Sequence, residues 1–334
     1  MPHGFTVALL VVLCLAVAFD YINGFHDTAN AIATSVATRA LRPSQAVVMA
    51  AFFNFVGAFA GTAVATTIGA GLVSPRSTTQ VVVAAALVGA IVWNLITWRL
   101  GLPSSSSHAL IGGLLGATLS AAGGAALNVQ GIVGKVLFPL VTSPVIGFLG
   151  ALLLMSALTR VFFGAPRKPM ARAFRRIQVL SAAYMAFAHG SNDAQKTMGI
   201  ITLALFSAGV LGSIQVPPWV IVLSASAISL GTAVGGWRIM KTMGHRVVDL
   251  EPVHGFAAET TAATVILGAA HLGMPVSTTH VISSAIMGVG TSQGLRGVRW
   301  GVAGDILTAW VLTLPASGLI GAGCWLTLNA LGAR

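Results

Sequence analysis

Two short polar motifs, each carrying an aspartate, interrupt apolar stretches of the sequence. The first motif runs from Gly24 to Asn30 and contains Asp27, and the second runs from Gly190 to Lys196 and contains Asp193. A charged side chain at the centre of a bilayer costs at least about 2.5–3.5 kcal/mol, so carboxylates in apolar stretches must meet cations, protons or hydrogen-bond donors. The two aspartates are therefore the leading candidates for a buried site.

Other polar side chains add possible ligands to this site. Asn23, Asn30 and Asn192 offer amide oxygens, which are hard ligands of the kind that small cations prefer. His26 and His189 lie in or beside the motifs, and histidine is the side chain best suited to accept and release a proton. These residue types predict coupling to a cation or a proton.

Two glycines and a further glutamate are also candidates for the cation site. Gly24 and Gly190 each stand three residues before an aspartate, and we expect them to break their helices and free backbone carbonyls for a cation. Glu259 is a further carboxylate inside an apolar stretch, where it contributes either to coupling or only to helix–helix hydrogen bonding.

Lys196 distinguishes the second motif from the first, because it stands where the first motif has Asn30. It lies one helical turn after Asp193 and can form an ion pair with it. It can equally offer a positive charge to an anion. The sequence leaves both roles open.

A second pair of motifs is rich in hydroxyl groups. Gly101 to His108 and Gly273 to His280 each place a proline before a run of serine or threonine, which is typical of a helix start. A helix N-terminus presents unpaired N–H groups and a partial positive charge, and so binds anions such as phosphate or sulfate. The hydroxyl groups that we expect to hold the anion belong to Ser105, Ser106, Ser107, Ser277, Thr278 and Thr279.

The composition places these motifs in a membrane protein. Of 334 residues, 56% are hydrophobic and only 7% are charged, against roughly 25% charged in a soluble domain. The net charge of +11 does not indicate nucleic-acid binding, because the basic residues lie between apolar runs. Two cysteines give no metal-binding spacing, and no resident cofactor is expected.

Apolar stretches of spanning length recur along the whole chain and predict an all-α polytopic membrane protein. Helices satisfy their own backbone in lipid, and the runs do not alternate as barrel strands do. We expect each stretch to cross the bilayer once. The stretches cover 5–38, 44–70, 79–98, 104–122, 131–159, 177–210, 218–237, 255–272, 277–294 and 300–330.

The densest cluster of basic residues predicts the orientation. Residues 160–176 carry six Lys and Arg residues, which favour the cytoplasmic side. With that segment inside, both termini are expected outside the cytoplasmic (inner) membrane. The sequence leaves the oligomeric state open, including a homodimer.

The paired motifs indicate an internal duplication. Asp193 follows Asp27 by 166 residues, and His280 follows His108 by 172 residues, so the motifs recur in the same order. Each half holds five stretches, and an odd number makes the second half enter from the opposite side. We therefore predict two inverted-topology repeats at 1–163 and 177–334, joined by a basic cytoplasmic linker at 164–176, with broken or re-entrant helices at the centre.

These four motifs resemble those of the inorganic phosphate transporter (PiT) family across nearly the whole chain. The aspartate motifs resemble the family's repeated G-x-N-D signature, and the hydroxyl motifs resemble its G-L/M-P-x-S-x-T-H segments. The resemblance implies symport of phosphate by alternating access, with Na⁺ or with H⁺, in some members as a metal–phosphate complex. It assigns Asp27, Asn30 and Asp193 to the central site, the hydroxyl groups to the anion, and Glu259 to a membrane glutamate of the family.

Two departures from the family pattern bear on the coupling ion. His26 replaces the usual asparagine of the first motif, and Lys196 replaces the asparagine that ends the second. Both changes resemble bacterial members of the low-affinity Pit type. They remove neutral oxygen ligands and add titratable nitrogens, and so favour proton coupling over Na⁺.

Three other functions remain as alternatives. A sulfate permease of the same architecture would need only hydrogen-bond donors, whereas an ionised aspartate can accept the hydrogen that HPO₄²⁻ offers. A channel would use rings of like residues without cation coupling. A hydrolase would need a nucleophile, but no G-x-S-x-G sequence is present, so we do not expect an enzyme.

Overall fold

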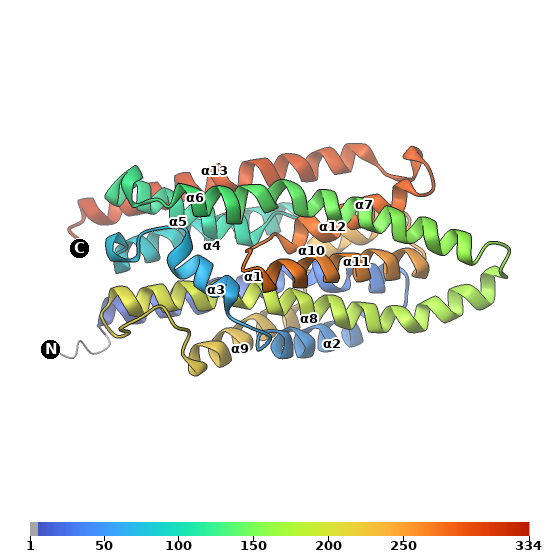
Figure 1. The fold of residues 1–334 in the computed structure, drawn as a ribbon, viewed down its shortest axis with the longest axis horizontal. Helices are drawn as coiled ribbons and strands as arrows, with labels where there is room; N and C mark the ends of the chain where they lie inside the picture. Colours follow the sequence, from blue (N-terminus) through green and yellow to red (C-terminus); the bar gives the residue numbers. More distant parts are fainter. Residues whose placement is uncertain (1–5, 334) are drawn as a thin grey trace.

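The computed structural model describes residues 6–333, which form a bundle of helices along one long axis (Figure 1). Several helices are long and apolar enough to cross a membrane, which confirms a multi-pass all-α protein. Phe5, the expected start of the first stretch, lies outside the described residues. The spanning candidates are α1 (Val7–Ala37), α4 (Gln80–Leu100), the continuous run of α6 and α7 (Val129–Val161) and α13 (Trp300–Ala330).

The two halves of the chain contain similar series of helices. The first half continues from α1 with α2 (Pro43–Gly57), α3 (Ala63–Thr66), α4, α5 (Ser106–Ala122), α6 (Val129–Ile132) and α7 (Phe138–Val161). The second half holds α8 (Arg167–Ser207), α9 (Pro218–Val234), α10 (Trp237–His245), α11 (Pro252–His271), α12 (Thr278–Thr291) and α13. Single turns of 3₁₀- or π-helix occur at Thr67–Gly71, Pro75–Ser77, Gly124–Ala126, Val133–Leu137 and Leu295–Gly297.

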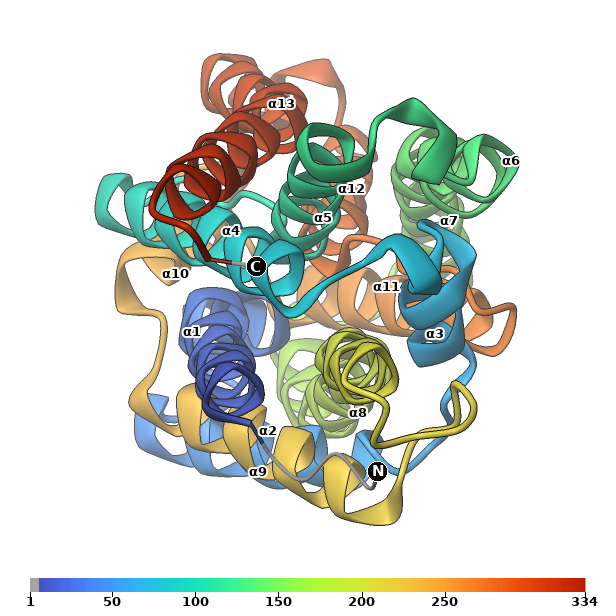
Figure 2. The same ribbon diagram turned by 90° about the vertical axis from the view of Figure 1, so that its left-hand side faces the viewer.

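Helices α1 and α8 lie side by side in the interior, and both carry an aspartate motif. The view along the bundle places them between α2 and α9 on one side and α4, α5 and α11 on the other (Figure 2). They run in opposite directions, so residues that are late in α8 face residues that are early in α1. This antiparallel packing brings the two motifs together.

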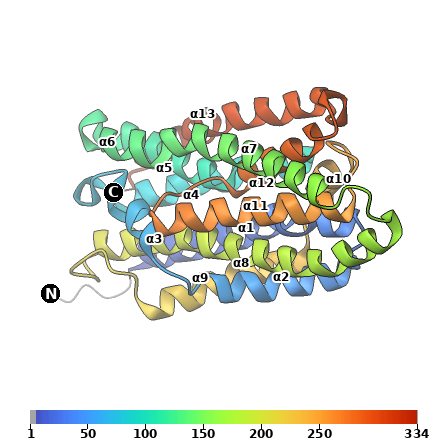
Figure 3. The same ribbon diagram turned by 45° about the vertical axis from the view of Figure 1, so that its right-hand side comes forward.

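Helices α4 and α5 form one helical hairpin, and α11 and α12 form a second. Helices α4 and α5 occupy the half of the bundle near the chain termini, and α11 and α12 occupy the opposite half (Figures 1 and 3). Both turns lie inside the protein, because residues 103–105 and 275–277 are buried. At the first turn, the indole of Trp310 donates to the Pro103 carbonyl. A glycine follows the first helix of each hairpin, and the crossing of the bilayer by each stretch stays a prediction. Gly101 and Gly273 adopt left-handed φ angles of 69° and 66°, which favour glycine.

The broken helices also differ in place from those expected. Helices α1 and α8 continue through Gly24 and Gly190, so the expected breaks and free carbonyls there are wrong. The glycines allow close helix packing instead. A Cβ atom at Gly24 would lie 2.3 Å from the Ile228 carbonyl oxygen of α9, and one at Gly190 would lie 2.2 Å from the Asn54 carbonyl oxygen of α2. A sharp bend of 71° occurs instead between α9 and α10.

Candidate functional site

The two motif aspartates face one another in the interior of the bundle. Asp27 on α1 and Asp193 on α8 are both buried, and His189 lies beside them. One ligand atom from each of these three residues lies within 4.8 Å of the other two. Such a cluster of two carboxylates and an imidazole can bind a proton or a small cation.

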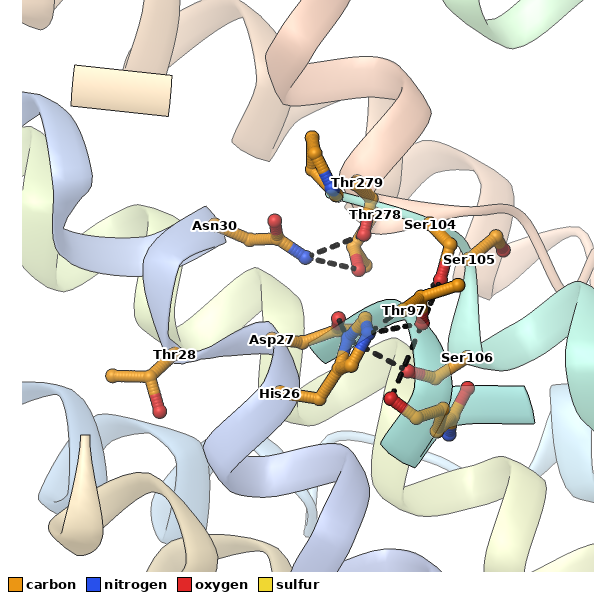
Figure 4. Close-up of polar contacts among 12 residues, drawn as sticks. His26, Asp27, Thr28, Asn30, Thr97, Ser104, Ser105, Ser106, Thr278 and Thr279 are labelled. Atoms are coloured by element: carbon orange, nitrogen blue, oxygen red, sulfur yellow. Dashed lines mark hydrogen bonds and ion pairs between the residues drawn. The ribbon is translucent and has the colours of Figure 1, made fainter. Parts of the chain in front are cut away.

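The first motif holds its aspartate with the neighbouring histidine. His26 Nδ1 lies 2.6 Å from Asp27 Oδ1, and its Nε2 lies 3.1 Å from the hydroxyl of Thr97 on α4 (Figure 4). Because an ionised carboxylate only accepts hydrogen bonds, this contact requires a proton on Nδ1. His26 therefore connects Asp27 on α1 to the C-terminal end of α4.

The second motif holds its aspartate with a lysine. Lys196 Nζ lies 2.5 Å from Asp193 Oδ1, and both side chains are buried. The same ammonium donates to the hydroxyl of Ser107 at the start of α5 and, at 3.2 Å, to the carbonyl of Val276. The sequence left an ion pair and an anion contact open as roles for Lys196. The ion pair is present, and its ammonium also reaches one of the hydroxyl clusters.

The hydroxyl motifs begin helices α5 and α12, as expected. The Ser105 side chain accepts from the His108 N–H, and the Ser277 side chain accepts from the His280 N–H, each at 3.1 Å. Ser105 and Ser277 therefore cap their own helices. The following residues are left to face the aspartates, and the Ser106 hydroxyl lies 3.4 Å from His26 Nδ1.

In each half, the last residue of the aspartate motif contacts the hydroxyl motif of the other half. Asn30 of the first half donates to the hydroxyls of Thr278 and Thr279 of the second, at 3.3 and 2.9 Å (Figure 4). Lys196, which occupies the matching position in the second half, donates to Ser107 of the first. The starts of α5 and α12 therefore meet around one polar centre that contains Asp27, Asp193, one ammonium group and several hydroxyls.

The three remaining candidates lie around this centre rather than in it. Asn192 donates to the Met274 carbonyl of the second hairpin, at 3.3 Å. Asn23 lies one turn before Asp27 on α1, and its amide forms no hydrogen bond among the described residues. Glu259 on α11 is buried in a separate cluster nearer the basic loop. It contacts α1 at Thr34, two helical turns after Asp27. Its carboxylate accepts from Thr34, Gln178 and Ser181.

Some of the site's polar partners were not identified from the sequence. Thr97 near the end of α4 bonds both His26 and, at 2.8 Å, Ser104. The amide oxygen of Asn54 on α2 accepts a hydrogen bond from His189 Nδ1 at 3.0 Å. A single polar residue in an apolar helix was the available signal, but many such residues only bond their own backbone. Their role depends on which neighbour they face.

Comparison with known proteins identifies the family to which this centre belongs. Residues 23–321 match the model described as the phosphate transporter family, which is most of the chain and includes all four motifs. The chain belongs to the phosphate transporter family. The expected resemblance is thereby confirmed, and the hydrolase alternative is wrong, because the family consists of transporters.

Full-length relatives of this phosphate transporter family member come from diverse bacteria. It is 49% identical to a protein of Bacillus subtilis over 97% of this chain and 98% of the relative, and 50% identical to one of Rhizobium meliloti over 95% of each. Both relatives carry the name "Probable low-affinity inorganic phosphate transporter". A solved structure titled "The sodium-dependent phosphate transporter" matches with a TM-score of 0.85 and 25% identity, over 98% of this chain and 100% of that one.

Proposed function

We propose that the protein is a secondary transporter that carries inorganic phosphate into the cell together with a cation, by alternating access. One observation carries this proposal. The starts of α5 and α12, from opposite halves of the chain, meet beside the buried carboxylates of Asp27 and Asp193. Helix N-termini and hydroxyls suit an oxyanion, and the carboxylates suit a cation.

Charge balance explains why the two substrates would travel together. Phosphate carries one or two negative charges at neutral pH, and the centre holds two aspartates against one lysine. In a buried site of low dielectric, this excess of negative charge would repel phosphate strongly. A proton or a metal cation between the carboxylates removes the repulsion, so phosphate binding and cation binding favour each other.

Each candidate residue receives a role in this proposal. The hydroxyls of Ser106, Ser107, Thr278 and Thr279, together with Asn30 and Lys196, bind phosphate. Ser105 and Ser277 orient the two helix starts through their caps. The coupling proton or cation is held by Asp27 and Asp193 and is assisted by His26, Asn23, Asn192 and Glu259.

The proposed transport cycle uses the two halves as inverted repeats. We assign residues 1–163 and 177–334 to the repeats and 164–176 to a basic linker on the cytoplasmic side. The described ends of the chain lie at the end of the bundle opposite that linker, which favours external termini in the inner membrane (Figure 1). Rocking one repeat against the other would then expose the central site to each side in turn.

Uptake of radioactive phosphate into proteoliposomes tests this function. We expect uptake to be driven by an inward proton gradient or an inward Na⁺ gradient and to collapse when the gradient is dissipated. Comparing the two gradients, with and without Mg²⁺, identifies the coupling ion and any accompanying metal. Gradient-independent flux would indicate a channel, and competition by sulfate at equal concentration would favour the sulfate alternative.

A further inference from the structure

A third carboxylate lies on the same face of α1, apart from the central site. Asp20 precedes Asp27 by seven residues, or two helical turns, which places it about 10 Å nearer the end that carries the termini. Its side chain is fully buried. Neither of its carboxylate oxygens has a hydrogen-bond partner among the described residues, and it forms no ion pair there.

The polar groups around Asp20 are also without partners. Asn23 lies on the same helix and Thr197 lies opposite on α8, and both side chains are close to the Asp20 carboxylate without meeting the geometry of a hydrogen bond to it. Both are buried, and neither the amide of Asn23 nor the hydroxyl of Thr197 has a hydrogen-bond partner within residues 6–333. Buried polar groups are rarely left unpaired, so three such neighbours together point to a ligand.

The chemistry of these groups selects the class of ligand. A carboxylate, an amide oxygen and a hydroxyl oxygen are hard ligands, which suit a small cation such as Na⁺ or a bound proton rather than an anion. Anion binding would place a negative charge against a buried carboxylate. The antiparallel packing of α1 and α8 brings these groups together. Asp20 on α1 lies opposite Thr197 on α8, and Asp27 lies opposite His189 and Asp193.

The nearby charges do not neutralise Asp20. The charged groups that face it are Asp193 and Lys196 on α8. The Lys196 ammonium is already engaged by Asp193, Ser107 and the Val276 carbonyl. Helix α9 also packs on α1 and has no titratable residue, and α4 has only an arginine at its far end. Asp20 therefore requires its own positive charge.

We propose that Asp20, Asn23 and Thr197 form a second binding site for a small monovalent cation, Na⁺ or H⁺. The site lies between the central site and the end of the bundle that carries the chain termini. This proposal rests on the proposed cation-coupled transport, in which the site would load the coupling ion before or alongside phosphate.

The test measures cation binding in the absence of phosphate. Purified protein in detergent is titrated with NaCl against N-methylglucamine chloride at constant ionic strength, and separately with pH without Na⁺, while the melting temperature is recorded. We expect the melting temperature to rise in one of the two titrations, and that titration identifies the bound ion. Asp20→Asn should raise the half-maximal Na⁺ concentration at least tenfold, or remove the proton-dependent change. Asp305→Asn, which alters an exposed carboxylate on α13, should behave as the unmodified protein does.

A second substitution and a second ligand complete the experiment. Thr197→Val keeps the carboxylate but removes the hydroxyl, and should raise the half-maximal Na⁺ concentration several-fold or shift the proton-dependent change, even if Asp20→Asn does not fold. Stabilisation by inorganic phosphate should survive in both variants within about threefold. Unchanged responses of both variants to Na⁺ and pH would overturn the second site, as would a wild-type protein that responds to neither. Loss of phosphate binding in the wild-type protein would instead count against the proposed function.

Discussion

The two aspartate motifs occupy matching positions but are held in different ways. In the first half, Asp27 contacts the neutral or protonated ring of His26, and Asn30 reaches the threonines of α12. In the second half, Asp193 forms an ion pair with Lys196, and the same lysine reaches a serine of α5. The two motifs therefore make equivalent contacts with the opposite half, but only the second motif carries a fixed positive charge.

This difference assigns different tasks to the two halves. A fixed ammonium group lies in the second half and can attract phosphate throughout a transport cycle. The first half offers the neutral amide of Asn30 and the imidazole of His26, which is a group that can take up a proton. We infer that the second motif contributes mainly anion affinity and the first mainly coupling. Substitutions at matching positions of the two motifs test this difference.

The largest effect is expected from removing either carboxylate. Asp27→Asn and Asp193→Asn should each abolish gradient-driven phosphate uptake while the protein still inserts into the membrane. Only Asp193→Asn should also lower stability markedly, because it leaves the buried Lys196 charge unpaired, at a cost of about 3–5 kcal/mol. Uptake assays and thermal melting of the purified variants measure the two effects.

The control for these variants is Asp249→Asn, because Asp249 is 87% exposed and, within residues 6–333, forms an ion pair with Arg299 alone. Near-normal uptake by Asp27→Asn or Asp193→Asn would remove that residue from the site. Equal loss of stability in both variants would contradict the difference between the motifs.

A smaller effect is expected when the second motif is made like the first. Lys196→Asn should raise the phosphate concentration for half-maximal uptake by about 10- to 100-fold, because a charge-assisted hydrogen bond contributes about 1.5–3 kcal/mol. The value should be measured on folded protein, with Lys241→Asn on the exposed face of α10 as a control. If the half-maximal concentration does not change, Lys196 serves only as the partner of Asp193.

The smallest effect is expected from single hydroxyl groups. Ser106→Ala and Thr278→Ala should each raise the half-maximal phosphate concentration by roughly 2- to 10-fold, since one neutral hydrogen bond contributes about 0.5–1.5 kcal/mol. Ser226→Ala removes a hydroxyl that donates to the Val222 carbonyl of its own helix, and should have no effect. A response from only one of the two clusters would show that phosphate is bound by one half alone.

Residue type and position along the chain predicted much of this architecture. The paired motifs predicted which side chains lie inside, and the serines at 105 and 277 correctly predicted the starts of α5 and α12. These features depend on local chemistry and on hydrophobic pattern. The membrane class followed from the same pattern.

The features that the sequence did not predict depend on packing between distant helices. Gly24 and Gly190 were expected to break helices, but the backbone of a neighbouring helix lies against each of them. A glycine that ends a helix and one that admits a close neighbour look the same in a sequence. The contacts of Lys196 with Ser107 and of Asn30 with Thr279 likewise require the antiparallel packing of α1 and α8.

The most direct test of a shared central site is to locate the bound anion. A crystal structure of the protein soaked in arsenate, a heavier analogue of phosphate, would give an anomalous scattering peak at the anion. We expect one peak between the first turns of α5 and α12, within hydrogen-bond distance of Ser106 or Ser107, of Thr278 or Thr279, and of Lys196. A peak that contacts only one of the two helix starts, or lies away from both, would contradict it.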